Sequence, residues 1–184
     1  MAQACIFLAT GYEEVEMLTV VDMLRRAKIS IDMVSITDQK EVTSSHNVTI
    51  TADKTLDEVD FDETEMLILP GGMPGAKHID QSPEADQWIR AAAEQGAYLC
   101  AICAAPMILG KRGLLAGCRA VCYPGFETDL HGARVEDGAI AADDHRITAC
   151  GMGAAQKFGA ALVAAMKGEE AAHKVWTSIL ADRK

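Results

Sequence analysis

Cys103 lies where an apolar run, residues 98–102, meets small residues and then Pro106. This order is typical of a buried strand, a sharp turn and a helix start, and the small residues Ala101 and Ala105 fit the crowded backbone of such a turn. Pro106 suits a first helical turn, because its missing N–H loses no hydrogen bond there. A thiol at a helix N-terminus meets unpaired N–H groups that favour the thiolate. The segment therefore predicts a nucleophilic cysteine, with an inert buried cysteine as the alternative.

Glu16 is the second residue whose position suggests chemistry. On a helix it shares the face of an apolar stripe, which is made by Val20, Met23, Leu24 and Ala27. A carboxyl on that face is buried, and burial raises its pKa until it can exchange a proton near neutral pH. The alternative is a solvent-facing glutamate that favours the helix dipole, the role we expect for Glu13 and Glu14.

Gly71 and Gly72 follow a short apolar run, residues 66–69, which we expect to be a strand. Open α/β sheets bind ligands at the carboxyl ends of their strands, and glycines there let backbone N–H groups approach a ligand or an oxyanion. A tight turn without a ligand is the alternative. Neither a phosphate-loop pattern nor a dinucleotide-binding glycine pattern after the first expected strand is present, and we expect no cofactor.

The remaining cysteines and the histidines give weaker signals. The chain has six cysteines and five histidines. We expect no disulfide framework and no closed zinc site, so no metal is predicted. Cys100 and Cys103 have the spacing of a redox motif, but Cys100 belongs to the expected strand rather than to the helix start. His46 and His131 lie in turn-rich stretches that would overhang a site, and a Cys–His pair formed in space stays open.

The bulk composition describes an ordinary globular chain. It has 184 residues, 49% hydrophobic and 24% charged, with a formal net charge of −10. The acidic balance argues against nucleic acid and anionic membranes as partners, and no apolar run approaches the length of a membrane span. The first residues lack a basic region, so we expect no secretory signal and a cytoplasmic location. We expect one domain over residues 1–184.

Strand and helix patterns alternate along the chain, which predicts an α/β fold with a mainly parallel sheet. Strands are expected at residues 4–9, 29–37, 66–69, 98–102, 120–123, 139–141 and 147–150, with a hairpin over 41–51. Helices are expected at residues 15–28, 83–95, 104–111, 153–167 and 169–180.

These motifs together resemble the ThiJ/PfpI superfamily, also called the DJ-one family. The resemblance covers nearly the whole chain, and the segment around Cys103, with Glu16 and the double glycine at matching places, is its most specific part. The matching segments are residues 9–16, 25–27, 69–72, 101–106 and 151–168. The resemblance implies a flavodoxin-like, class I glutamine-amidotransferase-like sandwich. In such a fold helices cover both faces of the sheet and the cysteine sits on a nucleophile elbow.

The resemblance also implies roles for individual residues. Cys103 matches the family's oxidisable nucleophile, and Glu16 matches its protonated carboxyl that hydrogen-bonds the thiolate. Gly72 and Ala104 would give backbone N–H groups to an oxyanion pocket next to Gly71. Arg26 matches an arginine near a dimer interface and anion site, and a homodimer is implied.

Two positions depart from the family pattern. Tyr123 stands where many members have a histidine, and tyrosine is a poor base at neutral pH. His46 stands where some relatives have an arginine that reaches across the dimer, so a pocket anion would be held less firmly. The resemblance implies attack by Cys103 on small reactive carbonyls, as in glyoxalase and protein deglycase activities, with a small carbonyl or anionic ligand. The alternative is an oxidative-stress sensor or chaperone-like protein whose Cys103 is oxidised to a sulfinate without turnover.

Overall fold

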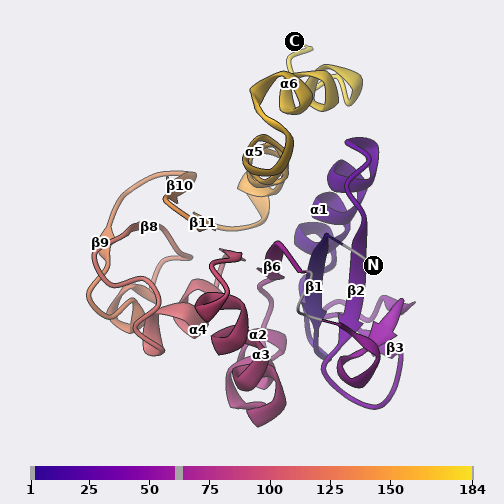
Figure 1. Ribbon diagram of the computed structural model, residues 1–184, viewed down its shortest axis with the longest axis vertical. Coiled ribbons are helices and arrows are strands. Elements are labelled where there is room, and N and C mark those ends of the chain that lie inside the picture. Colours follow the sequence, from indigo (N-terminus) through magenta and orange to yellow (C-terminus); the bar gives the residue numbers. More distant parts are fainter. Residues whose placement is uncertain (1–2, 61–63, 184) are drawn as a thin grey trace.

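A central sheet of seven strands organises the computed structural model, which describes residues 3–60 and 64–183 (Figure 1). The strand order is β10-β11-β7-β6-β1-β2-β5, and within it the pair β10–β11 is antiparallel while the other pairs are parallel. The bounds are β1 (Ala4–Leu8), β2 (Ile31–Ser35), β5 (Lys54–Thr55), β6 (Met66–Leu69), β7 (Tyr98–Ile102), β10 (Ile140–Asp143) and β11 (Arg146–Ala149). The predicted α/β fold with a mainly parallel sheet is confirmed.

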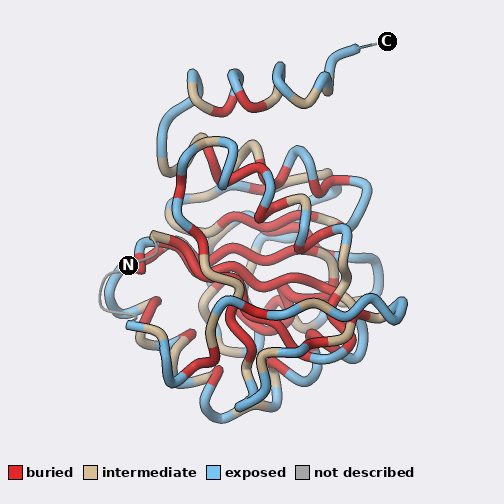
Figure 2. The backbone as a smooth tube through the Cα atoms, turned by 90° about the vertical axis from the view of Figure 1, so that its right-hand side faces the viewer, coloured by how far each residue is buried: buried red, intermediate tan, exposed pale blue. Residues whose placement is uncertain are grey.

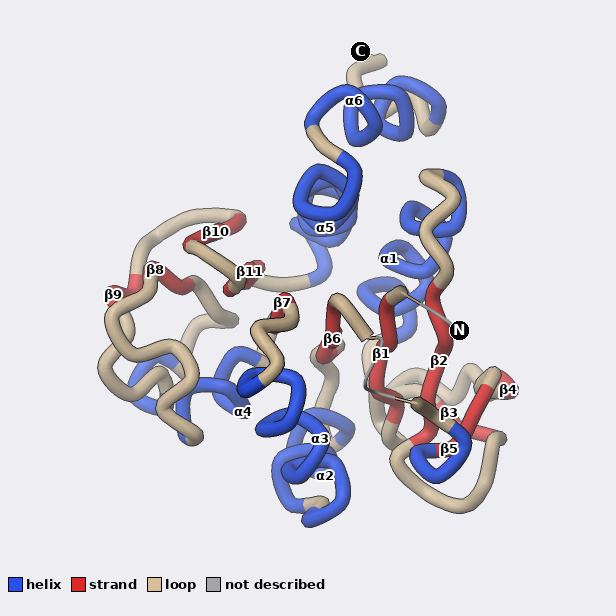
Figure 3. The backbone as a smooth tube through the Cα atoms, viewed as in Figure 1, coloured by secondary structure: helices blue, strands red, loops and turns tan. Residues whose placement is uncertain are grey.

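Helices cover both faces of this sheet (Figures 1 and 3). One face carries α1 (Glu14–Arg26) and α5 (Ala155–Lys167), with α6 (Glu169–Ser178) packed on the outer side of α5. The other face carries α2 (Gly75–Gln81), α3 (Pro83–Glu94) and α4 (Pro106–Lys111). The strands between these layers are buried along most of their length, as Figure 2 shows. Such burial on both faces explains why the strands β1, β6 and β7 are continuous apolar runs.

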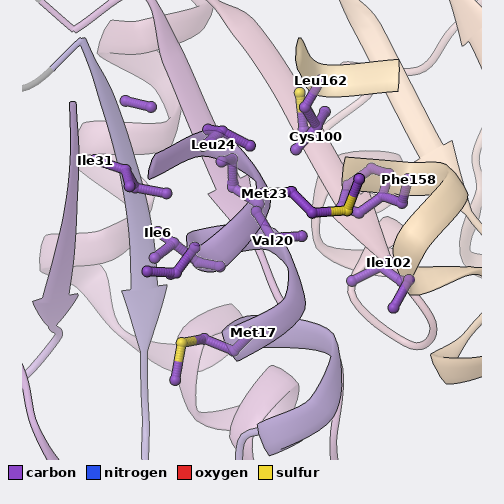
Figure 4. Close-up of a cluster of buried hydrophobic side chains, with 14 of the residues drawn as sticks. Ile6, Met17, Val20, Met23, Leu24, Ile31, Cys100, Ile102, Phe158 and Leu162 are labelled. Carbon is purple, nitrogen blue, oxygen red and sulfur yellow. The ribbon is translucent and has the colours of Figure 1, made fainter. Parts of the chain in front are cut away.

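The core on the α1 and α5 face contains the stripe that the sequence indicated. Val20, Met23 and Leu24 of α1 are buried against strand residues and against Phe158 of α5 (Figure 4). Gly159 of α5 permits this packing, because a Cβ there would lie 2.6 Å from the Met23 sulfur. The stripe thus fixes how α1 is rotated against the sheet.

On the opposite face a buried arginine joins three helices. Arg112 follows α4 and is bonded to Asp80 of α2, with 2.7 Å between Nη1 and Oδ1, and to Asp86 of α3. The side chain of Arg112 is 7% exposed, against 16% for Asp80 and 33% for Asp86, so the pairs are shielded from water mainly on the arginine side. The pairs hold α4, which follows the turn at Cys103, against its two neighbours.

Some predicted elements differ from the observed ones. The helix α2 was not expected, because Pro74 and Gly75 indicate a turn; Ala76 and Ile79 are nevertheless buried against the sheet. The short strands β5 and β9 (Arg134–Val135) were also missed. The strand expected over residues 120–123 is wrong in extent, since β8 (Arg119–Ala120) ends at the first of these residues and the backbone N–H groups of Val121 and Tyr123 bond outside a strand ladder.

The other predicted elements are present with shifts of a few residues at their ends. The expected hairpin is formed by β3 (Glu41–Thr43) and β4 (Thr49–Thr51), with Asn47 in a left-handed conformation at its turn. The helix expected from residue 153 begins with the 3-10 turn η3 (Met152–Ala154), and further 3-10 turns are η1 (Leu56–Glu58) and η2 (Glu127–Asp129). None of the described helices combines the length and apolarity that crossing a membrane requires.

Candidate active site

Cys103 occupies a strained turn between β7 and α4. Its φ angle is 64°, a left-handed conformation that a residue with a side chain seldom adopts. The Cys103 N–H donates to the carbonyl of Ala149 at 2.9 Å, and the Cys103 carbonyl accepts from the N–H of Tyr123 at 2.8 Å. Such a conformation costs about 1–3 kcal/mol and persists because the surroundings hold it. The predicted elbow is therefore present, and its backbone is fixed from two sides.

Gly71 makes the approach to Cys103 possible. A Cβ at this position would lie 2.5 Å from Cβ of Cys103 and 2.6 Å from Oε2 of Glu16. No real side-chain atom fits at those distances. The glycine therefore lets the loop after β6 touch the thiol and the carboxyl at once.

Glu16 is buried, with 1% of its surface exposed. The side chain of Glu13, which caps α1, accepts the Glu16 N–H at 2.6 Å, and Oε2 of Glu16 accepts the N–H of Gly71 at 2.9 Å. Oε1 is buried and has no hydrogen-bond partner of ordinary geometry within residues 3–60 and 64–183. Burial raises the pKa of Glu16 to about 7, against an ordinary value of 4.5. The carboxyl is thus suited to exchange a proton at neutral pH.

The thiol of Cys103 responds to the same surroundings. Burial and the negative charge of Glu16 raise its pKa to about 12, while the N–H groups of Ala104 and Gly72 act in the lowering direction. The backbone donors act in the direction that the sequence predicted, and burial acts against them with the larger effect. The Cys103–Glu16 pair loses its first proton near pH 7 and then holds a single negative charge.

Of the other predicted site residues, three lie around this pair. Gly72 and Ala104 direct their N–H groups at Sγ of Cys103, as already described. Tyr123 is bonded to the Cys103 carbonyl through its backbone, and its side chain is exposed, with 51% of the residue accessible. The ring lies beside the elbow, because a Cβ on Gly151 would be 3.4 Å from Tyr123 Cδ2 and 4.0 Å from Sγ of Cys103.

Arg26 and His46 lie apart from the pair. Arg26 is at the far end of α1, ten residues or roughly 15 Å from Glu16, and its Nε is 2.6 Å from Asp22 Oδ2. His46, in the β3–β4 turn, places Nδ1 2.9 Å from Oε1 of Glu14. Within one chain, therefore, Arg26 is not brought to the pocket, and the ring nitrogen of His46 faces a carboxylate.

One group of side chains in the described part of the chain has the arrangement of a metal site. The ligand atoms of Glu13, Glu14 and His46 lie within 4.8 Å of one another. The group stands at the start of α1, next to the buried pair, and its carboxylate Glu13 contributes to the raised pKa of Glu16.

A cavity of about 520 Å³ adjoins the elbow. Tyr123 and Gly151 form part of its wall, and these are the residues that lie against Cys103. Most of this wall was not predicted from the sequence; it comes from residues 122–124, Glu127 and residues 135–138 and 150–153. The closely spaced glycines Gly151 and Gly153 directly after a strand were the available signal.

The sequence model of the DJ-1/PfpI family matches residues 2–165. The chain belongs to the DJ-1/PfpI family. Protein dj-1beta of Drosophila melanogaster is 31% identical over 179 residues, which cover 96% of each chain. A protein of Pyrococcus horikoshii named as a deglycase is 27% identical over 142 residues, covering 76% of this chain and 84% of that protein.

Solved structures of the DJ-1 family agree with the fold. Oxidized DJ-1 of Toxoplasma gondii superposes with a TM-score of 0.93 at 29% identity, covering 98% of both chains. Drosophila melanogaster DJ-1beta gives a TM-score of 0.91 at 30% identity, again covering 98% of both. The family and the fold implied by the sequence motifs are thereby confirmed.

Proposed function

We propose that this DJ-1/PfpI protein uses Cys103 to add to small reactive carbonyl compounds. The observation that carries the proposal is the buried pair of Cys103 and Glu16, with the N–H groups of Gly72 and Ala104 directed at Sγ. A buried carboxyl with a pKa of about 7 beside a thiol with a raised pKa is the arrangement that general-base activation of a thiol requires. The deglycase name of the Pyrococcus horikoshii relative is consistent with this class of substrate.

The proposed step balances without a cofactor. Sγ of Cys103 attacks the aldehyde carbon, and the electrons of the C=O π bond move to the oxygen. The Glu16 carboxylate takes the proton from Sγ and passes it to that oxygen, which yields a hemithioacetal. Backbone N–H groups near Sγ stabilise the negative charge that develops on the oxygen before the proton arrives.

Consumption of methylglyoxal by the purified protein tests the proposal. We expect stoichiometric uptake of methylglyoxal as the hemithioacetal, which the variant Cys103→Ser abolishes, because serine at this position lacks a thiol that Glu16 can deprotonate. Cys118→Ser is the matched control, since Cys118 is a partly exposed cysteine away from the pair, and it should keep the activity. Equal consumption by Cys103→Ser would rule the proposal out.

A second candidate is an oxidation sensor. Glu16 beside Sγ can donate its proton to a sulfinate, and the solved DJ-1 of Toxoplasma gondii is described as oxidized. Two molecules of a peroxide would convert the thiol to a sulfinic acid, each peroxide being reduced to its alcohol or water. Mass spectrometry should then find two added oxygens on Cys103. A Cys100–Cys103 disulfide as the main product would contradict this reading.

We further infer a homodimer and a cytoplasmic location. DJ-1 family proteins are often dimeric, and α1 exposes Val15 and Leu18, which are 45% and 43% accessible, on the helix that also carries Arg26. The six cysteines are all free, as is usual in a reducing compartment. Light scattering on the purified protein tests the dimer, and a monomer at micromolar concentration would exclude it.

A further inference from the structure

The wall of the cavity beside Cys103 is negatively charged, and these charges have no role in the proposed addition to a carbonyl. Glu127, Glu136 and Asp137 contribute to its wall, and no lysine or arginine is among the described residues that line it. Glu136 is partly offset by Arg119, whose Nη1 lies 3.8 Å from Oε2. Glu127 and Asp137 are exposed. The cavity therefore presents negative charge to whatever enters it.

The charge acts on the interior of the cavity. Cys122, another wall residue, has a pKa raised to about 11 by burial and then by the negative charge of Glu127. The formal net charge of −10 for the whole chain has the same sign, so the long-range field also repels anions. Arg26, the basic residue that the family resemblance implied for an anion site, is paired with Asp22 elsewhere on α1.

The rest of the wall suits a cation with an apolar body. Three exposed apolar side chains, Tyr123, Val135 and Met152, line the cavity, with 43–54% of each residue accessible. An aromatic ring together with carboxylates is the combination that recognises ammonium groups, by cation–π contact and by charge. Gly151 and Tyr123 belong both to the cavity wall and to the surroundings of Cys103, so the cavity lies next to the thiol.

We propose that this cavity binds the non-reacting part of the carbonyl substrate and selects a positively charged group there. The preferred substrates are aldehydes that carry an ammonium or guanidinium group a few bonds from the carbonyl carbon. The inference rests on the proposed function, because it assumes that the carbonyl carbon is presented to Cys103. It replaces the expectation of an anionic ligand with that of a cationic one.

Protection of Cys103 from alkylation tests the proposal without requiring turnover. Betaine aldehyde, glycolaldehyde and glyoxylate serve as cationic, neutral and anionic aldehydes, and labelling of Cys103 by iodoacetamide is followed by peptide mapping. Half-protecting concentrations are divided by those for free cysteine, which removes the intrinsic reactivity of each aldehyde. We expect the cation to protect at a concentration at least about tenfold lower than the anion, with a smaller ratio at high salt.

The variant Glu127→Gln/Asp137→Asn should reduce this preference by about tenfold while leaving protection by glycolaldehyde unchanged. Glu136 stays in place, since Arg119 already offsets it. The matched control is Glu94→Gln/Asp38→Asn, which removes two exposed acidic residues that do not line the cavity and should keep the preference. The cation inference fails, while the proposed function stands, in two cases. In the first, glycolaldehyde protects Cys103 but betaine aldehyde and glyoxylate protect equally well; in the second, the control variant loses the preference for the cation as much as the cavity variant does. If no aldehyde protects Cys103, the proposed function fails with it.

Discussion

Replacing Glu16 with glutamine should move the pH at which Cys103 becomes reactive. The amide keeps the shape of the side chain but has no ionisable proton. In the wild-type protein the Cys103–Glu16 pair loses its first proton with a pKa of about 7, and the resulting negative charge is shared with Sγ. In Glu16→Gln the first proton to leave must come from the thiol itself, which stays buried.

The size of the change follows from these values. With a pKa of about 7, roughly 10% of the wild-type pairs are ionised at pH 6 and roughly 90% at pH 8, so alkylation should rise about ninefold between them and then level off. In Glu16→Gln the thiol is the group that ionises, and burial keeps its pKa above the ordinary value of 9.0, which is at least about two units above the pKa of the wild-type pair. The variant should therefore continue to gain about tenfold per pH unit through pH 8.

The assay is the rate of iodoacetamide labelling of Cys103 between pH 5.5 and 9.5, read by peptide mapping. Cys118 provides an internal reference in the same samples, because it lies away from the pair. Tyr123→Phe is the matched variant: its backbone bond to Cys103 remains, and its exposed hydroxyl takes no part in the pair, so the wild-type profile should persist. An unshifted profile in Glu16→Gln, or a large shift in Tyr123→Phe, would refute the assignment of Glu16 as the partner.

Three further predictions follow from the same contacts. Because folding raises the pKa of Glu16 from 4.5 to about 7, the free energy of unfolding should fall by about 3 kcal/mol as the pH rises through this window, and urea unfolding of Glu16→Gln at pH 5 and pH 8 should lack that loss. Gly71→Ala should displace the pair and abolish the inflection near pH 7 in Cys103 labelling, since its Cβ would overlap both partners; the substitution Gly96→Ala, at a glycine with free space around it, should leave the inflection intact. Arg112→Met should cost about 2 kcal/mol in urea unfolding, because Asp80 and Asp86 lose the guanidinium that is shielded from water and keep only the more exposed cations of Lys111 and Arg90; an equal loss in Arg90→Met, whose pair is more exposed, would contradict that reasoning.

The sequence predicted the parts of the site that depend on local patterns. The burial of Glu16 follows from helical periodicity, because a residue four positions before Val20 lies on the same buried face of the helix. The elbow follows from an apolar run, small residues and Pro106 in a fixed order. In both cases one side chain or one turn is determined by its neighbours in the chain.

Features that depend on distant segments escaped prediction. A strand was expected over residues 120–123, but Val121 donates to Thr148 Oγ1 of β11 and Tyr123 donates to the Cys103 carbonyl, so the segment makes irregular bonds to β11 and the elbow instead of a ladder. The helix α2 forms because Ala76 and Ile79 are buried by the sheet, which no local signal at Pro74 reveals. The raised pKa of Cys103 likewise reflects burial among several elements rather than the start of α4 alone.

Both candidate functions depend on the protonation state of the Cys103–Glu16 pair, but they require opposite states of Glu16. Addition to a carbonyl requires an ionised Glu16 to accept the thiol proton, and this form is available above about pH 7. A sulfinate on Cys103 would place a permanent negative charge beside Glu16, and two adjacent buried charges are unfavourable, so Glu16 would hold its proton to higher pH. Oxidation therefore removes both the nucleophile and the base in one step. A protein that acts on carbonyls would therefore lose its activity when Cys103 is oxidised. In a sensor, the proton retained by Glu16 would instead stabilise the sulfinate as the signalling form.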